Sequence, residues 1–331
     1  MTENERQQLI ALVQQFTDKR VLVIGDVILD EYIVGRARRM SREAPIPVLE
    51  QTERRYIAGG AANPAMTLRA LGADTRLVGV VGDDPQQASL QSCLQDSHVD
   101  AHLLSDDARS TLVKTRILAT MGLRFPQQVA RIDTISRTEI TSELEAKILQ
   151  QGQSVKSGEA ILLSDYLCGL LTPGLVRSII AYGQQHKVLV AVDAQGELDK
   201  YAGATLVKCN ADEASAYLLT DLRTHADFEQ AVQTIYGKLG LSGAMVITRG
   251  AEGAIVYDGQ SMTHCPSPDV QDVFDTVGAG DTAIAVMTVA RLAGATFVQA
   301  VMLANFASGI VVQHVGNYAP TPQELVEAIN D

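Results

Sequence analysis

The chain of 331 residues predicts an α/β fold in which helices cover both faces of a mostly parallel central sheet. Strand-like and helical segments alternate along most of the sequence. Residues 21–24 form a continuous apolar run that ends in Gly25-Asp26, as in a strand buried on both faces. Other expected strands end in Asp165, Asp193 and Gly250, and ligands collect at the carboxyl ends of such strands.

The expected elements follow one another without a Pro-, Gly- or Ser-rich linker, a low-complexity tract or an internal repeat. A final apolar segment is predicted to be a helix that Gly294 ends. In chain order we expect a strand at 21–26, a helix at 60–72, a strand at 75–80, a helix at 85–97, a strand at 160–164, a helix at 173–185, strands at 188–193 and 205–208, helices at 212–219 and 226–239, a strand at 244–248 and a helix at 282–293.

Two stretches, about 31–57 and 110–133, alternate apolar and polar residues with no helix between. They predict extended strands of a small separate sheet, inserted into the α/β body as a lid over a site. We therefore expect a single domain over 1–331 with a β lid. The exposed strands of that lid predict a homodimer in which two lids pair edge to edge.

Composition excludes several classes of protein. The 27 basic and 39 acidic residues give a net charge of −12, which argues against a nucleic-acid partner. Four widely spaced cysteines without a C-x-x-C pair suit the cytoplasm and indicate neither zinc nor disulfides. No apolar run reaches the 18 residues that span a membrane, and the N-terminus does not resemble a signal peptide.

The segment Asp275–Asp281, Asp-Thr-Val-Gly-Ala-Gly-Asp, is the most informative motif. Its glycines permit a tight turn into a helix, where free N–H groups and the helix dipole favour an anion. Asp281 beside such a site can accept a proton from an attacking hydroxyl, which indicates phosphoryl transfer to an alcohol. The alternative is a plain loop with Asp281 as N-cap. No acidic residue follows at the spacing of a dinucleotide fold, and no Walker A loop occurs.

Five ordered motifs across the chain resemble those of the ribokinase (PfkB) family of sugar kinases. They are Gly25–Asp30, Gly59–Asn63, Asn210–Glu213, Thr248–Gly250 with Gly253, and Asp275–Asp281. The resemblance implies a three-layer α/β/α ribokinase-like fold and an enzyme that uses ATP and Mg²⁺, with K⁺ as a further possibility. The runner-up functions are a kinase of another sugar or nucleoside, and a catalytically silent sugar-binding regulator.

Within that family, residues 24–32, 41–48, 59–66 and 163–166 look like the kinases of D-glycero-β-D-manno-heptose 7-phosphate. This resemblance implies phosphorylation of the anomeric O1 to the 1,7-bisphosphate, in ADP-heptose and lipopolysaccharide core synthesis. It also implies a phosphorylated sugar as substrate. Two positions depart from the subfamily, because Cys168 and Gln195 stand where it usually has lysine.

The resemblance assigns roles to residues at the catalytic and nucleotide sites. Asp281 would be the base, and the N–H groups that follow Gly278, those of Ala279, Gly280 and Asp281, would stabilise the transferring phosphoryl group. Glu213, with Asn210, would organise Mg²⁺ through water, unless the two only cap a helix. The remaining nucleotide- or cation-binding candidates are Thr248, Gly250, Gly253, Asp275, Thr276 and Asn305.

The expected sugar site combines carboxylates, a glycine turn and lid cations. Its candidates are Asp26, Asp30, Gly59, Gly60, Asn63 and Asp165, with Arg39, Arg116 and Arg131 for the substrate phosphate. Arg38, Arg42, Lys114 and Arg124 lie in or beside the same lid segments. The alternative for each lid cation is a solvated residue that protects a strand edge.

Overall fold

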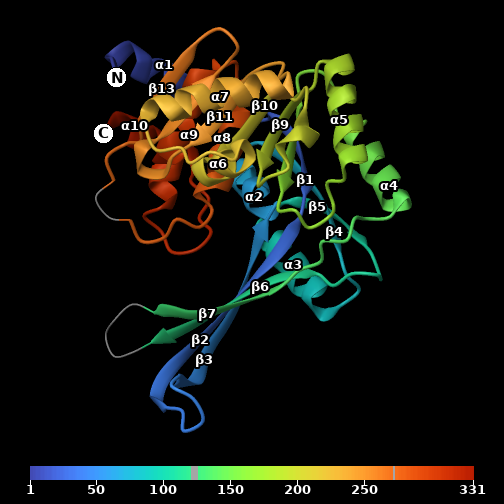
Figure 1. Cartoon of the computed structure of the whole chain (residues 1–331), viewed down its shortest axis with the longest axis vertical. Helices are drawn as coiled ribbons and strands as arrows, with labels where there is room; N and C mark the ends of the chain where they lie inside the picture. Colours follow the sequence, from blue (N-terminus) through green and yellow to red (C-terminus); the bar gives the residue numbers. More distant parts are fainter. Residues whose placement is uncertain (121–125, 271–272) are drawn as a thin grey trace.

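A nine-stranded sheet forms the centre of the molecule in the computed structural model, which describes residues 1–120, 126–270 and 273–331 (Figure 1). The strand order is β13-β12-β11-β10-β9-β8-β1-β4-β5. The β11–β12 and β12–β13 pairs are antiparallel, and the other neighbouring strands are parallel. The strands are β1 (Arg20–Gly25), β4 (Asp74–Val81), β5 (Asp100–Ser105), β8 (Ala160–Asp165), β9 (Leu189–Ala194), β10 (Leu206–Asn210), β11 (Ala244–Thr248), β12 (Ala254–Tyr257) and β13 (Met262–Cys265).

Helices cover both faces of this sheet, so the predicted fold class is confirmed. One face packs against α1 (Glu3–Val13), α2 (Ala62–Ala70), α3 (Pro85–Asp96), α8 (Ala279–Leu292), α9 (Phe297–Val311) and α10 (Pro322–Asn330). The other packs against α4 (Ser142–Gly152), α5 (Pro173–His186), α6 (Ala211–Leu218) and α7 (His225–Leu239). Two short 3₁₀ turns are Leu198–Tyr201 and Gly250–Glu252.

The central elements follow from the apolar pattern of the sequence. Val23 and Ile24 of β1 are fully buried, and they point to opposite helical layers because side chains alternate along a strand. In α8 every residue from Thr282 to Ala290 is buried, so this helix runs through the interior and ends before Gly294. No helix in the described ranges is long and apolar enough to cross a membrane.

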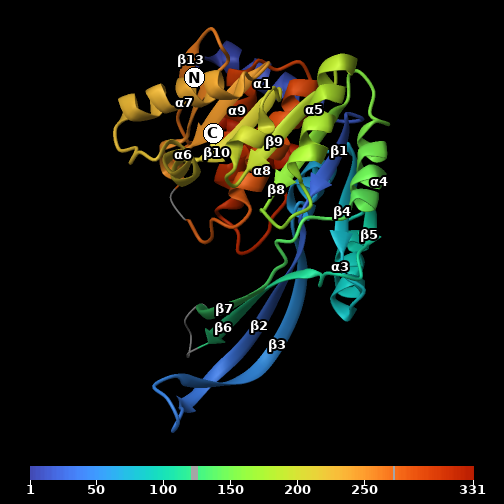
Figure 2. The same ribbon diagram turned by 45° about the vertical axis from the view of Figure 1, so that its right-hand side comes forward.

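A second, four-stranded sheet projects from the body, as Figures 1 and 2 show. Its order is β3-β2-β6-β7, with β2 (Val27–Met40), β3 (Pro47–Gly60), β6 (Leu112–Thr120) and β7 (Gln127–Thr134). We call this sheet the lid. It begins earlier than the sequence suggested, since only Asp26 separates β1 from β2. Of the lid cations, Arg124 lies outside the described residues.

Two helix starts differ from expectation for local reasons. Gly60 does not begin a helix, because it pairs with Val27 at the end of β3, and α2 starts at Ala62. Conversely, α8 starts at Ala279 rather than at 282, immediately after Gly278. Gly278 has a φ of 81°, a left-handed conformation that glycine adopts without strain.

Candidate active site

The N-terminus of α8 forms the predicted turn. In the described part of the chain, the N–H groups of Gly280 and Asp281 have no hydrogen-bond acceptor, and that of Ala279 has only the Thr276 carbonyl at 3.4 Å. Free N–H groups at a helix start form a site for an anion. A side chain at 280 would be crowded as well, since a Cβ there would lie 3.1 Å from Lys208 Nζ.

Two neutral donors orient the carboxylate of Asp281. Asn63 Nδ2 donates to Oδ2 at 2.8 Å, and Tyr166 Oη donates to Oδ1 at 2.7 Å. Desolvation in the protein interior, followed by the negative charge of Asp193, raises the pKa of Asp281 to about 6, although both hydrogen bonds oppose the rise. A carboxylate with a pKa near the working pH suits a general base.

Asp281 lines a cavity of about 730 Å³ between the carboxyl ends of the central strands and α8 and α9. Most of the residues predicted for nucleotide binding come together here, although they are distant in the sequence. Those that line the cavity are Asn210, Glu213, Thr248, Gly250, Gly253, Thr276, Ala279, Gly280 and Asn305.

Asn210 and Glu213 form a capping box at the start of α6, as the alternative interpretation of this pair expects. Asn210 Oδ1 accepts the Glu213 N–H at 2.8 Å, and Glu213 Oε2 accepts the Asn210 N–H at 2.6 Å. Burial raises the pKa of Glu213. In the described ranges no three His, Cys, Asp or Glu side chains gather as a metal site. The Glu213 carboxylate lines the cavity, so it would suit a Mg²⁺ that arrives with the nucleotide and keeps its waters.

Asn305 and Asp275 stabilise the walls of the site. Asn305 Nδ2 donates to the carbonyls of Cys265 and Pro266, at 2.9 and 3.1 Å. Asp275 Oδ1 accepts the N–H of Val277, and its Oδ2 accepts the N–H of Gly316, at 3.0 and 2.9 Å. Asp275 thus links the glycine turn to the segment after α9.

Asp26, Asp30 and the glycine turn at Gly59–Gly60, which were predicted for the sugar, lie where the lid joins the body. Asp26 Oδ2 accepts the N–H groups of Tyr166 and Cys168, at 2.9 and 3.1 Å. Its Oδ1 is buried without a partner among the described residues. Burial and the charge of Asp165 raise the pKa of Asp26 to about 6. A buried oxygen without a partner costs stability, so it is a candidate acceptor for a ligand hydroxyl.

Asp30, a candidate for the sugar, lies beside the glycine turn. Arg116 Nη1 donates to Asp30 Oδ1 at 2.5 Å, and Asn317 Nδ2 donates to Oδ2 at 3.3 Å. A Cβ on Gly59 would come within 2.2 Å of that second oxygen, so only glycine fits. A Cβ on Gly60 would similarly meet the Asp26 carbonyl at 2.3 Å.

Two residues predicted for binding have surroundings that the sequence did not indicate. Asp165 is buried and already bonds to Lys200 Nζ, the Tyr201 hydroxyl and the Leu167 N–H. Arg39 lies at the outer end of β2, about 30 Å along the strand from Asp30 at about 3.3 Å per residue. Figure 1 shows this end of β2 pointing away from the body that contains α8.

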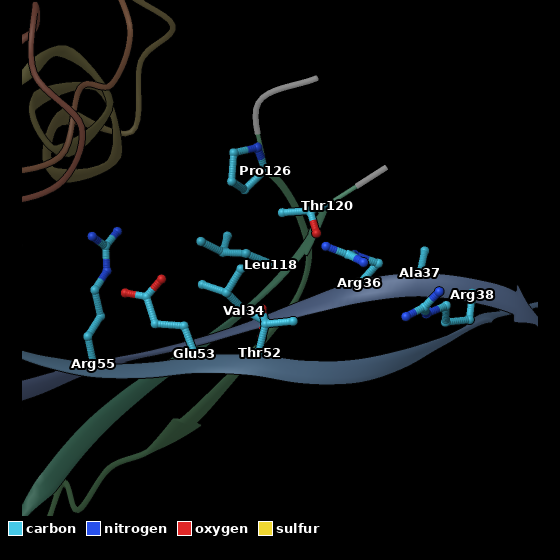
Figure 3. Close-up of a pocket in the computed structure, with 10 residues that line it drawn as sticks. All are labelled: Val34, Arg36, Ala37, Arg38, Thr52, Glu53, Arg55, Leu118, Thr120 and Pro126. Atoms are coloured by element: carbon cyan, nitrogen blue, oxygen red, sulfur yellow. The ribbon is translucent and has the colours of Figure 1, made fainter. Parts of the chain in front are cut away.

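Three arginines, Arg55, Arg116 and Arg131, lie on one face of the lid, because they are in register with Tyr32 across its four strands. Arg116 and Arg131 are directly opposite in the pairing of β6 with β7, and Arg131 is bound to Asp133 at 2.9 Å. The guanidinium carbons of Arg55 and Arg116 lie 4.8 and 5.3 Å from the ring centre of Tyr32. Figure 3 shows Arg55 at one end of an 880 Å³ hollow on the lid, with Arg36 and Arg38 at the other.

Sequence reasoning missed four residues at the site, namely Arg55, Tyr166, Lys208 and Asn317. Lys208 carried the clearest signal, since it is a single cation inside an apolar strand. Tyr166 follows the acid that ends β8, the edge of the sheet where ligands bind. Arg55 and Asn317 had no comparable signal, because their positions depend on the register of the lid and on a loop.

Residues 18–324 match the pfkB family of carbohydrate kinases. The chain belongs to this family. Its members are ATP-dependent phosphotransferases with an alcohol as acceptor, and the resemblance expected from the five motifs is confirmed. Two similar relatives are the bifunctional protein HldE of Geobacter metallireducens, 38% identical over 97% of this chain, and that of Geotalea uraniireducens, 36% identical over 98%. The chain spans about two thirds of their length, 65% and 66%.

Solved structures of two other kinases share the fold. Phosphofructokinase-2 from Escherichia coli in complex with substrates and products has a TM-score of 0.77 and 20% identity, over 95% of this chain and 99% of that one. Ribokinase from Arabidopsis thaliana complexed with ribose and ATP has a TM-score of 0.74 and 20% identity, over 95% and 100%.

Proposed function

We propose that the protein phosphorylates O1 of D-glycero-β-D-manno-heptose 7-phosphate with ATP and Mg²⁺, giving the 1,7-bisphosphate for ADP-heptose and lipopolysaccharide core synthesis. The observation that carries the kinase chemistry is the position of Asp281. Its carboxylate lies beside unpaired N–H groups, in a cavity large enough for a nucleotide. The heptose assignment rests on similarity to the HldE proteins and on the motifs at 41–48 and 163–166.

In this proposal Asp281 accepts the proton of the O1 hydroxyl as O1 attacks the γ-phosphorus of ATP. The bond from that phosphorus to the bridging oxygen breaks, and ADP leaves with the electron pair. The N–H groups of Ala279, Gly280 and Asp281 stabilise charge on the transferring group. Mg²⁺ bound to the nucleotide would neutralise phosphate charge, with Glu213 reaching it through water.

The lid supports a phosphorylated substrate. Arg116 contacts Asp30, so a sugar bound at Asp30 would have a guanidinium beside it. Arg55 is a second cation and lies near the Tyr32 ring, as Arg116 does. Arg131 is a third and lies opposite Arg116 in the pairing of β6 with β7. Each guanidinium can donate two parallel hydrogen bonds to two oxygens of one phosphate. These arginines therefore favour a sugar phosphate over an unphosphorylated sugar.

We place the protein in the cytoplasm, where its four free thiols stay reduced and ATP is present. K⁺ would act near Asp275 and Thr276, which adjoin the catalytic turn. One neighbour of this fold, phosphofructokinase-2 from Escherichia coli, has been solved in complex with potassium.

A homodimer through the lid is part of the same proposal. Strands β3 and β7 are the outer strands of the lid in the described residues. Tyr56 and Ile132 on these strands are 38% and 58% exposed, which leaves apolar surface for a second lid. Size-exclusion chromatography with light scattering should give twice the mass of 35.5 kDa. A monomer at micromolar concentration would contradict the dimer and leave the kinase proposal intact.

ADP release with ATP and Mg²⁺ tests the function across five acceptors: heptose 7-phosphate, the unphosphorylated heptose, fructose 6-phosphate, ribose and adenosine. We expect turnover of heptose 7-phosphate alone, and a loss of roughly 10²–10⁴-fold in kcat for Asp281→Asn. Turnover of another acceptor would replace the heptose assignment. Sugar binding without turnover of any acceptor would instead indicate a silent sugar-binding regulator.

A further inference from the structure

The segment after α9 places a side chain between the lid and the catalytic turn. Asn317 follows Gly316, whose N–H donates to Asp275 Oδ2 at 2.9 Å. The side-chain amide of Asn317 donates from Nδ2 to Asp30 Oδ2 at 3.3 Å and to the Ala58 carbonyl at 3.2 Å. Asn317 is thus fixed to the catalytic turn through its backbone neighbour and to the lid through its side chain.

These partners determine how the amide of Asn317 is turned. Both atoms that Nδ2 contacts, a carboxylate oxygen and a carbonyl oxygen, are hydrogen-bond acceptors. Both N–H bonds of Nδ2 are therefore used, and Oδ1 points away from Asp30. Oδ1 accepts no hydrogen bond within the described part of the chain, and Asn317 is only half-buried, so this acceptor is open to a ligand.

The free oxygen of Asn317 faces the turn that carries Asp281. A Cβ on Gly278 would lie 3.3 Å from Asn317 Oδ1 and 2.6 Å from Asn63 Nδ2. Asn63 in turn donates to Asp281 Oδ2 at 2.8 Å. Asp30 and Asp281 are therefore each held by an asparagine, and both asparagines lie against Gly278. A sugar that contacts both carboxylates must pass Asn317 Oδ1.

We propose that Asn317 is a sugar-binding residue, whose Oδ1 accepts a hydrogen bond from the hydroxyl next to the one that Asp30 accepts. The hydrogen bond from Nδ2 to Asp30 keeps the two acceptors close together, so their spacing suits hydroxyls on neighbouring carbon atoms. This inference rests on the proposed kinase function. It implies that the sugar substrate carries two adjacent free hydroxyls besides the one that is phosphorylated.

The alternative is a structural role, in which Asn317 acts only by orienting Asp30. Arg116 holds the other oxygen of that carboxylate, so a second donor would complete its orientation. In that role Oδ1 of Asn317 contacts no substrate, and loss of the Nδ2 donor accounts for every effect of a substitution. A variant that keeps an oxygen but loses the donor therefore separates the two roles.

The test compares Asn317→Leu with Asn317→Asp. Leucine removes both the donor and the acceptor, whereas aspartate keeps an acceptor and removes only the donor to Asp30. Steady-state kinetics gives kcat/KM for heptose 7-phosphate and for its 2-, 3-, 4- and 6-deoxy analogues, each of which lacks one hydroxyl. In the wild type, loss of the hydroxyl that Asn317 binds should lower kcat/KM up to about 10-fold, the scale of one hydrogen bond.

Asn317→Leu should lower kcat/KM for the complete sugar by a similar factor, and should use one deoxy analogue as well as it uses the complete sugar. Asn317→Asp should keep the wild-type preference over that analogue, even where repulsion from Asp30 raises KM for both sugars. Loss of this preference in both variants, or in neither, would overturn the contact. If Asn317→Leu does not fold, Asn317→Ala removes the same groups and takes its place. A wild-type protein without activity on heptose 7-phosphate would instead contradict the proposed function, so the two failures are distinguishable.

Discussion

The Tyr166 hydroxyl donates a hydrogen bond of 2.7 Å to Oδ1 of Asp281. Burial, followed by the charge of Asp281, raises the pKa of Tyr166 well above its ordinary value, so the phenol stays protonated and remains a donor. With Asn63 on the other oxygen, both oxygens of the carboxylate are oriented before a substrate arrives. Tyr166 therefore acts as a positioning residue for the proposed base.

Tyr166→Phe should move the acidic limb of the pH–rate profile to higher pH. The Tyr166 hydrogen bond lowers the pKa of Asp281, so its loss lets that pKa rise above about 6. The base must be ionised to work, and the variant then loses activity at a higher pH than the wild type does. At pH 8 we expect kcat to fall less than about 10-fold, the scale of one hydrogen bond.

Tyr182→Phe is the matched control, because the Tyr182 hydroxyl donates to the carbonyls of Gln153 and Val155, which lie outside the active site. Its pH–rate profile should coincide with that of the wild type. An unshifted acidic limb in Tyr166→Phe would show that Tyr166 does not set the charge of the base.

Arg55→Gln should raise KM for heptose 7-phosphate about 10-fold or more, because it removes a cation from the proposed phosphate site. Arg54→Gln is its control on the same strand, since Arg54 pairs with Glu31 on the opposite face of the lid. Steady-state kinetics with the phosphorylated and unphosphorylated heptose measures the effect. Equal changes for both sugars would place the phosphate elsewhere.

Asp26→Asn should stabilise the protein at pH 8 and hardly at pH 4. The pKa of Asp26 is raised in the folded state to about 6, so its contribution is favourable below about pH 4 and is lost as pH rises through 6. An amide avoids burying that charge, and the gain at pH 8 is on the order of 2 kcal/mol in the free energy of unfolding. Chemical denaturation of both proteins at pH 4 and pH 8 measures the free energy of unfolding. An equal gain for Asp26→Asn at the two pH values would exclude ionisation of Asp26 as the cause.

Gly280→Ala should weaken binding of the non-hydrolysable ATP analogue AMP-PNP several-fold, because its Cβ would press on the Lys208 ammonium at 3.1 Å, in the wall of the nucleotide cavity. Gly237→Ala in α7 has no atom within 4 Å of the new Cβ, and should stabilise the helix by about 0.5–1 kcal/mol. Isothermal titration and thermal unfolding of both variants provide the comparison. Unchanged AMP-PNP affinity in Gly280→Ala would show that Lys208 can move aside without loss.

Sequence periodicity predicted the layers of the fold because buried strands and helices leave strong apolar signals, as in 21–24 and α8. The glycine turn before α8 could also be predicted, because its conformation depends on its own residues and not on distant contacts. Asp165 was assigned to the sugar because the sequence does not show that Lys200 and Tyr201 approach it. Arg39 was placed near the site because the length by which β2 extends from the body depends on long-range pairing. The position of Lys208 beside Asp193 could not be predicted, because it depends on the register between β9 and β10.

The direct passage from β1 into β2 links the lid mechanically to the base. A single residue, Asp26, ends the buried strand and begins the lid, and its carboxylate accepts the Tyr166 N–H. The other end of Tyr166 bonds to Asp281. A rotation of the lid would move the backbone at Asp26, and we expect this movement to reach Asp281 through the Tyr166 side chain. Sugar capture and alignment of the base would then be the same movement.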